Sequence, residues 1–274
     1  MDNSQDREKH QKEVSDCNKD MSVTILGSGT CVPSLKRSSC SVLIETGKAK
    51  ILIDCGLGTI RRLLENSTEI YDISHILLSH FHPDHTGELV SFLFASKYPD
   101  GSKRKIPLTV IGGRGLSNFY AGLKSVFGNW IDLMPSVLNI IELDSGKNAI
   151  RLNDTVLEYI SVEHNVESLA YKITGNNGCS VVYSGDTDFC DNLIKISNNT
   201  DLLICESALP DELKVKGHLT PSFAGRIATA ANAKKLILTH FYPECDNIDI
   251  KAQCRKTYSG ELILAEDLMK EKIG

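Results

Sequence analysis

The sequence lacks any hydrophobic run that approaches the length of a membrane-spanning helix, about 20 apolar residues. It also lacks a Cys-x-x-Cys pair, although it contains nine cysteines, an odd number scattered along the chain. Scattered thiols of this kind are typical of a reducing compartment rather than of a disulfide framework. We therefore expect a cytoplasmic protein without a membrane segment, whose cysteines mostly pack as small apolar groups.

An excess of positive charge is missing as well. The net charge is −5, which argues against a broad basic surface for sequence-independent nucleic-acid binding. One short basic run, Lys103-Arg104-Lys105, is interpreted as a solvated loop. Residues 1–20 are polar and charged and lack the apolar centre of a secretory signal. We expect residues 1–20 to be a disordered extension and residues 21–274 to form a single domain.

A cluster of metal-binding residue types follows a short apolar run at 76–78. His80, His82, Asp84 and His85 lie within six residues, in a chain with only eight histidines. Neutral imidazole and carboxylate suit zinc, manganese or iron. His80 and His82 are two residues apart, so in an extended segment they project to the same side. This loop could supply ligands to two neighbouring metals; a chance cluster of surface groups is the weaker interpretation.

Apolar runs bounded by turn signals predict two series of strands. In the first series helices separate the strands, which indicates layered α/β packing. The second series opens with four consecutive strands, and Gly175-Asn176-Asn177-Gly178 predicts a hairpin turn between the third and fourth. The predicted strands are 23–26, 41–44, 51–53, 76–78, 107–111, 139–143, 149–152, 156–162, 169–174, 180–184, 202–205 and 236–239, and the predicted helices are 59–66, 116–127, 221–231 and one that begins near Leu89.

Two phrases of the sequence are nearly the same. Ile-Leu-Leu-Ser-His-Phe at 76–81 and Leu-Ile-Leu-Thr-His-Phe at 236–241 each place a histidine at the carboxyl end of an apolar strand. This suggests an internal duplication, with two β-rich halves packed face to face and helices outside. Their loops would meet at one edge, where ligands of open sheets collect. A chance similarity of two buried strands is the alternative.

The segment from His80 to His85 matches the His-x-His-x-Asp-His signature of the metallo-β-lactamase superfamily. His164, Asp186 and His240 match the later motifs in the right order and resemble the branch that contains ribonuclease Z. The resemblance covers the chain after the first twenty residues. It implies an α/β (α+β) fold, a four-layer αββα sandwich in which two mixed sheets are flanked by helices.

The same resemblance implies a dinuclear metal centre. Two divalent cations, zinc first and manganese or iron as alternatives, would hold a bridging hydroxide for attack. The implied ligands are His80, His82 and His164 for one cation, Asp84, His85 and His240 for the other, and Asp186 as the bridge between them. Asp54 follows the strand at 51–53 and is expected to hold a ligand imidazole in one tautomer, with a turn cap as the alternative. Cys31, Cys40 and Cys55 could lie nearby, and we favour packing over ligation for them.

Further residues resemble the catalytic groups of ribonuclease Z relatives. His218, in Gly-His-Leu-Thr, and the upstream Glu206 resemble the pair that contacts the scissile phosphate, and Asp84 resembles the proton-handling base. As an imidazolium, His218 could stabilise phosphate charge or protonate the leaving oxygen. Its alternative role is that of a helix-capping histidine.

One departure from ribonuclease Z concerns its long Gly/Pro-rich arm, which clamps transfer RNA. Between His164 and Asp186 this sequence has only the predicted hairpin. We therefore expect a metal-dependent phosphodiesterase whose substrate is either RNA or a small diester.

The alternatives are a carboxyl-ester, thioester or lactone hydrolase on the same metals, and a non-hydrolytic iron-bound sensor or redox protein. His82 argues against the last, because flavodiiron relatives place a glutamate there. Related proteins are often homodimers, which the sequence does not decide.

Overall fold

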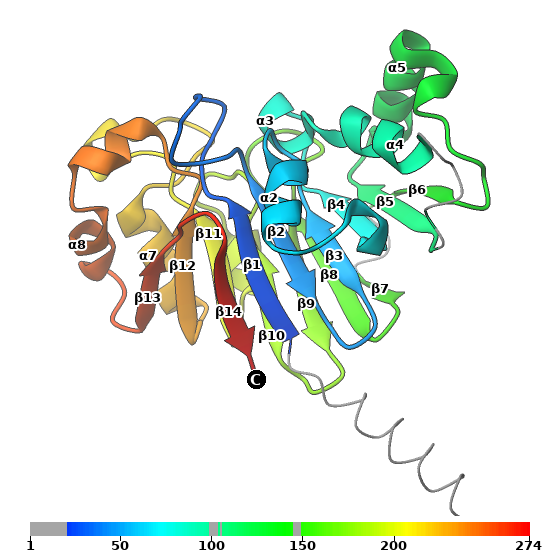
Figure 1. The fold of residues 1–274 in the computed structure, drawn as a ribbon. Helices are drawn as coiled ribbons and strands as arrows, with labels where there is room; N and C mark the ends of the chain where they lie inside the picture. Colours follow the sequence, from blue (N-terminus) through cyan, green and yellow to red (C-terminus); the bar gives the residue numbers. More distant parts are fainter. Residues whose placement is uncertain (1–20, 99–103, 105, 145–148) are drawn as a thin grey trace, which may run out of the picture.

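The structure is a computed structural model that describes residues 21–98, 104, 106–144 and 149–274. Two mixed sheets face each other in the described part, and helices cover their outer faces (Figure 1). The first sheet has the strand order β14 (Met269–Ile273), β1 (Met21–Gly27), β2 (Ser41–Glu45), β3 (Lys50–Ile53), β4 (His75–Leu78), β5 (Leu108–Gly112) and β6 (Leu138–Glu142). The second has the order β13 (Glu261–Leu264), β12 (Lys235–Thr239), β11 (Leu202–Glu206), β10 (Ser180–Tyr183), β9 (Leu169–Gly175), β8 (Thr155–Ser161) and β7 (Ala149–Leu152).

The helices belong to one sheet or the other. The first sheet is covered by α2 (Thr59–Glu65), α4 (Leu89–Lys97) and α5 (Leu116–Phe127), and the second by α6 (Asp191–Ile196), α7 (Pro221–Ala230) and α8 (Ile250–Arg255). The short helix α3 (Pro83–Thr86) lies in the loop after β4. Short 3-10 turns lie at Ile70–Asp72, Gly128–Trp130, Asp211–Leu213 and Pro243–Asn247. This architecture confirms the predicted fold class, two mixed sheets flanked by helices.

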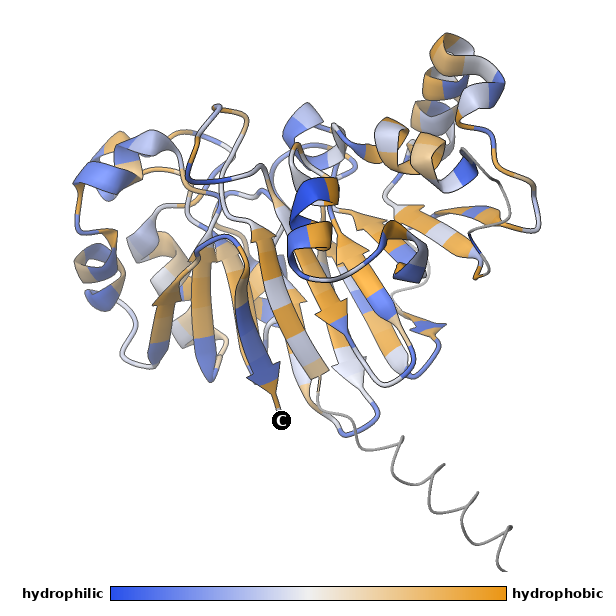
Figure 2. Ribbon diagram, viewed as in Figure 1, coloured by the Kyte–Doolittle hydropathy of each residue, from blue (hydrophilic) through white to orange (hydrophobic). Residues whose placement is uncertain are grey.

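The central strands of the first sheet are apolar on both faces because each face packs against a partner. Along β3, Ile51 and Ile53 belong to the core between the sheets, whereas Leu52 packs under the outer helices. In β4, Leu77 points inward, and its two neighbours point outward. Alternate side chains of a strand face opposite sides, so a strand buried on both faces reads as a continuous apolar run. Figure 2 shows this hydrophobic character along the central strands.

The C-terminal strand β14 crosses back to the first sheet and pairs antiparallel with β1. Sequence analysis did not predict β13, β14, α6 or α8. Asp267, between β13 and β14, accepts hydrogen bonds from Ser28 N and Oγ (2.9 and 2.8 Å) and from Ser38 N (2.7 Å). Its Oδ2 also pairs with Arg62 at 2.9 Å. The end of the chain therefore secures the β1–β2 loop, which borders the candidate site.

The basic run at 103–105 is corrected in part. Arg104 does not lie in solvent: it is 5% exposed and donates hydrogen bonds to the carbonyl oxygens of Ile70 and Ile73. Burial lowers the pKa of its guanidinium to about 10. Lys103 and Lys105 lie outside the described residues, as does the predicted extension at 1–20. No helix in the described part is long and apolar enough to cross a membrane. The single-domain assignment stays a prediction.

Candidate metal centre

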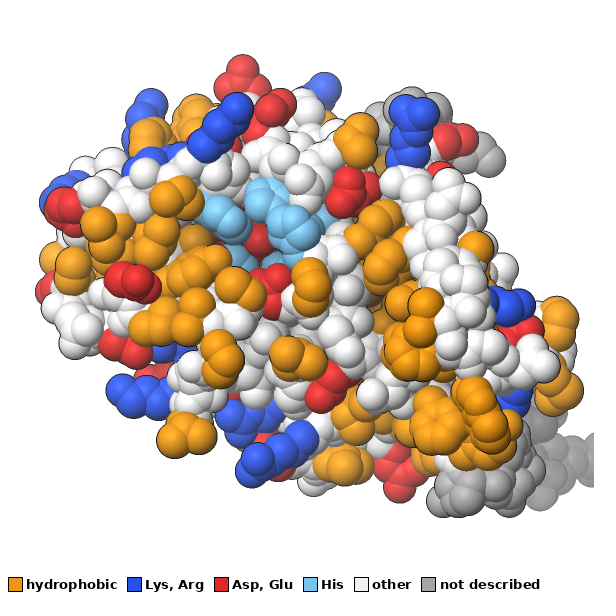
Figure 3. All heavy atoms as spheres, turned by 90° about the horizontal axis from the view of Figure 1, so that it is seen from above, with side chains coloured by type: hydrophobic (Ala, Val, Ile, Leu, Met, Phe, Trp, Pro, Cys, Tyr) orange, Lys and Arg blue, Asp and Glu red, His pale blue; other side chains and the backbone are white. Residues whose placement is uncertain are grey.

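The candidate site lies where the strands of both sheets end. Parallel strands β3 and β4 of the first sheet and β10, β11 and β12 of the second all deliver their carboxyl ends to the upper edge of Figure 1. Seen from that side, histidine side chains gather in a hollow, with acidic side chains among them (Figure 3). The predicted meeting of the two sets of loops at one edge is therefore observed.

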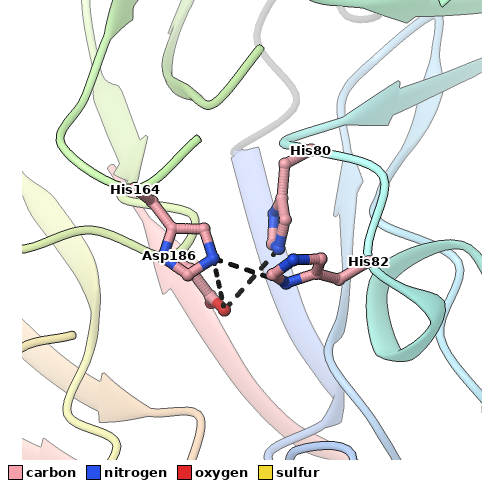
Figure 4. Close-up of side chains that lie close together, drawn as sticks. All are labelled: His80, His82, His164 and Asp186. Atoms are coloured by element: carbon pink, nitrogen blue, oxygen red, sulfur yellow. Dashed lines mark hydrogen bonds and ion pairs between the residues drawn. The ribbon is translucent and has the colours of Figure 1, made fainter. Parts of the chain in front are cut away.

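One group of candidate ligands combines the β4 loop with two loops of the second sheet (Figure 4). The ligand atoms of His80, His82, His164 and Asp186 all lie within 4.8 Å of one another. His80 Nε2 and His164 Nε2 are 3.7 and 3.9 Å from Asp186 Oδ2. His82 presents Nδ1, which is 3.4 Å from His164 Nε2. The predicted first set of ligands is thus brought together around one carboxylate oxygen.

The second group faces the other oxygen of the same carboxylate. His85 Nε2 and His240 Nε2 lie 3.3 and 3.4 Å from Asp186 Oδ1. Asp84 Oδ2 lies 3.8 Å from His85 Nε2 and 3.6 Å from His240 Nε2. Asp186 therefore has one oxygen directed at each group, which is the arrangement expected of a carboxylate between two cations.

The buried atoms of the cluster fit divalent cations. His80 Nε2, His85 Nε2, His240 Nε2 and Asp186 Oδ1 are buried and have no hydrogen-bond partner among the described residues. Buried polar atoms without partners are costly, and native proteins rarely leave several of them together. Burial and the neighbouring His85 lower the pKa of His80 to about 2, so its ring is neutral, as ligation requires. A converging set of imidazole nitrogens and carboxylate oxygens suits zinc.

The buried Asp54 carboxylate forms hydrogen bonds with a candidate ligand, His85, and with residues around it. Its Oδ2 lies 2.7 Å from His85 Nδ1, and Ser79 N, Ser79 Oγ and the Tyr183 hydroxyl donate to the same carboxylate at 2.8 Å each. Asp54 is fully buried and has φ 59°. A carboxylate at Nδ1 keeps the proton there and leaves Nε2 free to bind a cation. Sequence analysis expected Asp54 to hold a ligand imidazole but did not identify which one, and it missed Ser79 and Tyr183, which carry no sequence signal.

His218 and Glu206 form a pair at the edge of the cluster. His218 Nδ1 is 3.0 Å from Glu206 Oε1, and Glu206 also accepts hydrogen bonds from Thr187 N (2.9 Å) and Ala208 N (3.2 Å). Burial lowers the pKa of His218, but the hydrogen bond and charge of Glu206 outweigh it and raise the pKa to about 9. The His218 side chain keeps 16% exposure, so a protonated ring borders the hollow.

The three cysteines expected near the site, Cys31, Cys40 and Cys55, have different surroundings. Cys40 Sγ lies within 4.8 Å of ligand atoms of His85 and His240, but it donates to the Gly29 carbonyl at 3.3 Å. Burial raises the pKa of the Cys40 thiol well above its usual value, which favours the protonated form. Cys31 contacts the Tyr242 hydroxyl (3.5 Å), and Cys55 is buried beside the metal loop.

Sequence analysis also missed Asn165, whose side-chain amide nitrogen lies 3.1 Å from His82 Nε2. His82 thus has Nε2 next to Asn165 and Nδ1 next to His164. Asn165 directly follows the predicted ligand His164, and this adjacency was the only signal that could have identified it.

Comparison with known proteins adds to this geometry. Residues 21–256 match the family model described as anti-Pycsar protein Apyc1. The chain belongs to this family. Among curated relatives, ribonuclease Z of Clostridium acetobutylicum is 29% identical over 280 residues, covering 81% of this chain and 88% of that protein. Ribonuclease Z of Methanosarcina acetivorans is 25% identical and covers 92% of this chain and 97% of that protein.

Solved structures with the same fold include a metallo-β-lactamase fold protein, YhfI of Bacillus subtilis, and the short form of human tRNase Z. YhfI has a TM-score of 0.80 at 24% identity and covers 93% of this chain and 100% of that one. The human enzyme has a TM-score of 0.73 at 26% identity and covers 92% and 99%. The predictions of a ribonuclease Z-like metallo-β-lactamase fold and of a metal-dependent phosphodiesterase are confirmed, and the ester-hydrolase alternative is not favoured.

Proposed function

We propose that this Apyc1-family member hydrolyses small phosphodiesters at a dinuclear metal centre. The observation that carries the proposal is the Asp186 carboxylate: its Oδ1 faces the buried, unpartnered Nε2 atoms of His85 and His240, and its Oδ2 faces that of His80. The His218–Glu206 pair beside it supplies a charged donor for a phosphate. An ester or lactone carbonyl would have less use for such an imidazolium.

Two cation positions follow from the proposed ligand sets. His80, His82 and His164 with Asp186 Oδ2 would hold one ion, and Asp84, His85 and His240 with Asp186 Oδ1 the other. Zinc suits this set of nitrogen and oxygen donors, with manganese and iron as alternatives. When bound, such a pair lowers the pKa of water and neutralises charge on the phosphate oxygens. Asp54 keeps the His85 ring oriented for its ion.

Two residues would handle protons. Burial raises the pKa of Asp84, but the adjacent His240 side chain, 3.6 Å away, and the charge of His85 outweigh burial and lower the pKa to about 2. Asp84 is therefore a carboxylate near neutral pH and can accept a proton from the attacking water. His218, held through Nδ1 by Glu206, can donate from its other nitrogen to a phosphate or leaving oxygen.

The preference for a small substrate over RNA is supported by the segment between His164 and Asp186. Its strands are β9 and β10, joined at a tight turn, and Gly178 in that turn has φ 83°. The described chain therefore has no long arm at the place where ribonuclease Z relatives carry one. The net charge of −5 also disfavours a long polyanion. A cytoplasmic location and a homodimer stay predictions.

The experiment compares four substrate types with purified, zinc-loaded protein: bis-p-nitrophenyl phosphate, cyclic nucleotides, precursor transfer RNA and a lactone panel. We expect turnover of the first two and little cleavage of the RNA. Efficient cleavage of precursor RNA without turnover of small diesters would overturn the substrate preference. Turnover of lactones alone would overturn the proposed reaction class.

A further inference from the structure

The loop at 214–220 lies against the metal cluster and carries His218. Within it, the Gly217 carbonyl accepts a hydrogen bond from His164 Nδ1 at 2.8 Å. That bond places the imidazole proton on Nδ1 and leaves Nε2 to face Asp186. Gly217 has φ 88°, and a Cβ atom there would lie 3.2 Å from His164 Nδ1. The orientation of His164 therefore depends on where this loop holds Gly217.

Asp188 fixes the position of Gly217. Its Oδ2 accepts hydrogen bonds from Gly217 N and from Lys214 Nζ, each at 2.9 Å. Its Oδ1 accepts from Phe189 N at 2.8 Å. The Asp188 carboxylate therefore ties both ends of the 214–217 segment together.

Asp188 belongs to a segment in which consecutive residues act on different parts of the centre. Asp186 faces both ligand groups, and Thr187 N donates to Glu206, the partner of His218. Asp188 accepts a hydrogen bond from Gly217 N. The Gly217 carbonyl contacts His164, and His218 is the next residue along the chain. One short stretch after β10 thus sets the geometry of both sides of the hollow.

We propose that Asp188 is a positioning residue of the metal centre, acting on His164 through Gly217. The Asp188 carboxylate holds Gly217 in place, the Gly217 carbonyl orients the His164 ring, and His164 Nε2 is presented to its cation. This rests on the proposed role of His164 as a ligand. Losing a group that orients a metal-binding histidine typically weakens metal affinity by about 10–100-fold.

The test measures zinc affinity by competition with a chelator, without any substrate. We expect Asp188→Ala to weaken one of the two zinc ions by about tenfold and to leave the other near wild type. Asp201→Ala is the matched control, because Asp201 also binds a lysine (Lys234 Nζ, 2.6 Å) and a backbone amide (Ser180 N, 2.8 Å). Ser180 begins β10, so that pair lies at the opposite end of the strand. Equal zinc affinities in the two variants would overturn the proposal.

A double-mutant cycle distinguishes positioning from general support of the fold. If Asp188 acts through His164, then adding Asp188→Ala to His164→Ala causes no further loss of zinc affinity. Additive losses would contradict that route. A failure of the proposed diesterase activity would leave these affinities unaffected, so the two proposals fail separately.

A second variant disturbs the same contact without altering Asp188. Gly217→Ala places a methyl group against His164 Nδ1, and we expect it to weaken the same zinc ion. Gly178→Ala is its control, because Gly178 has a similar φ of 83° and its added Cβ meets nothing within 4 Å. The comparison remains decisive if Asp188→Ala does not fold. Equal zinc affinities in the two glycine variants would overturn the proposal.

Discussion

The two sheets contribute to the site in different ways. The first sheet concentrates His80, His82, Asp84 and His85 in a single loop after β4. The second distributes its groups, with Asp186 after β10, Glu206 at the end of β11 and His240 after β12. Similar strand phrases, one before His80 and one before His240, therefore produce a compact ligand loop in one half and a single ligand in the other.

His240 of the second half also differs from the first-sheet histidines His80 and His85 in how it is held. His85 has a buried carboxylate, Asp54, on its Nδ1, and His80 Nδ1 lies 3.1 Å from Ser79 Oγ. His240 has no partner on either nitrogen among the described residues, and its φ is 62°. His80 and His85 are therefore oriented by side chains of their own sheet. His240 is oriented by its backbone and by packing.

The largest expected effect comes from the residue that joins the halves. Asp186→Ala removes the carboxylate that faces both ligand groups, so we expect loss of tightly bound zinc and activity at background. Metal analysis after dialysis measures the first and bis-p-nitrophenyl phosphate turnover the second. If both ions stay at wild-type affinity, Asp186 does not bridge them.

A second prediction concerns only the groups that the second sheet contributes. His218→Ala should lower diester turnover by about 10²–10⁴-fold while the zinc content stays at the wild-type value. The reason is that His218 Nδ1 lies 3.0 Å from Glu206 Oε1 but 3.9 Å from Asp186 Oδ2, so its nearer partner is Glu206. Unchanged diester kinetics in this variant would remove its assigned role, and loss of zinc would make it a ligand instead.

The third prediction breaks the orientation of a first-sheet ligand. Asp54→Asn keeps the shape of the side chain but replaces one acceptor oxygen with an NH2 group. The side chain can then no longer accept hydrogen bonds from His85, Ser79 and Tyr183 together. We expect zinc affinity to fall by about 10–100-fold. Chelator competition and thermal unfolding are measured side by side. A lower unfolding temperature with unchanged zinc affinity would show that Asp54 supports the fold only.

The smallest effect is expected at Cys40, which lies near His85 and His240. Cys40→Ser should leave zinc affinity and diester turnover near wild type, because the thiol is protonated and donates to Gly29 O. A zinc affinity lowered as far as in Asp54→Asn would show that Cys40 is a ligand rather than a packed thiol.

The sequence alone predicted candidate ligands where they lie close together along the chain. The first loop could be interpreted directly, since its candidate ligands are neighbours along the chain. The ligand roles of His164, Asp186 and His240 came only through resemblance, because nothing in spacing shows which distant strand ends share an edge. The predicted strands and helices agree with the structure wherever an apolar run has both faces buried.

The missed elements lack such signals. β14 is an edge strand whose residues Lys270, Glu271 and Lys272 are charged, so its apolar content is too low to predict pairing with β1. Arg104 looked like a solvated side chain because its carbonyl partners, Ile70 and Ile73, are remote in sequence. Asp188 resembles any turn aspartate until the 214–217 loop is placed beside it.

The most direct test of the centre is a calorimetric titration of metal-free protein with zinc. Two sets of ligands around one carboxylate predict two zinc ions per chain, both lost or weakened in Asp186→Ala. A single zinc ion per chain, or none, would contradict the dinuclear centre from which the proposed reaction follows.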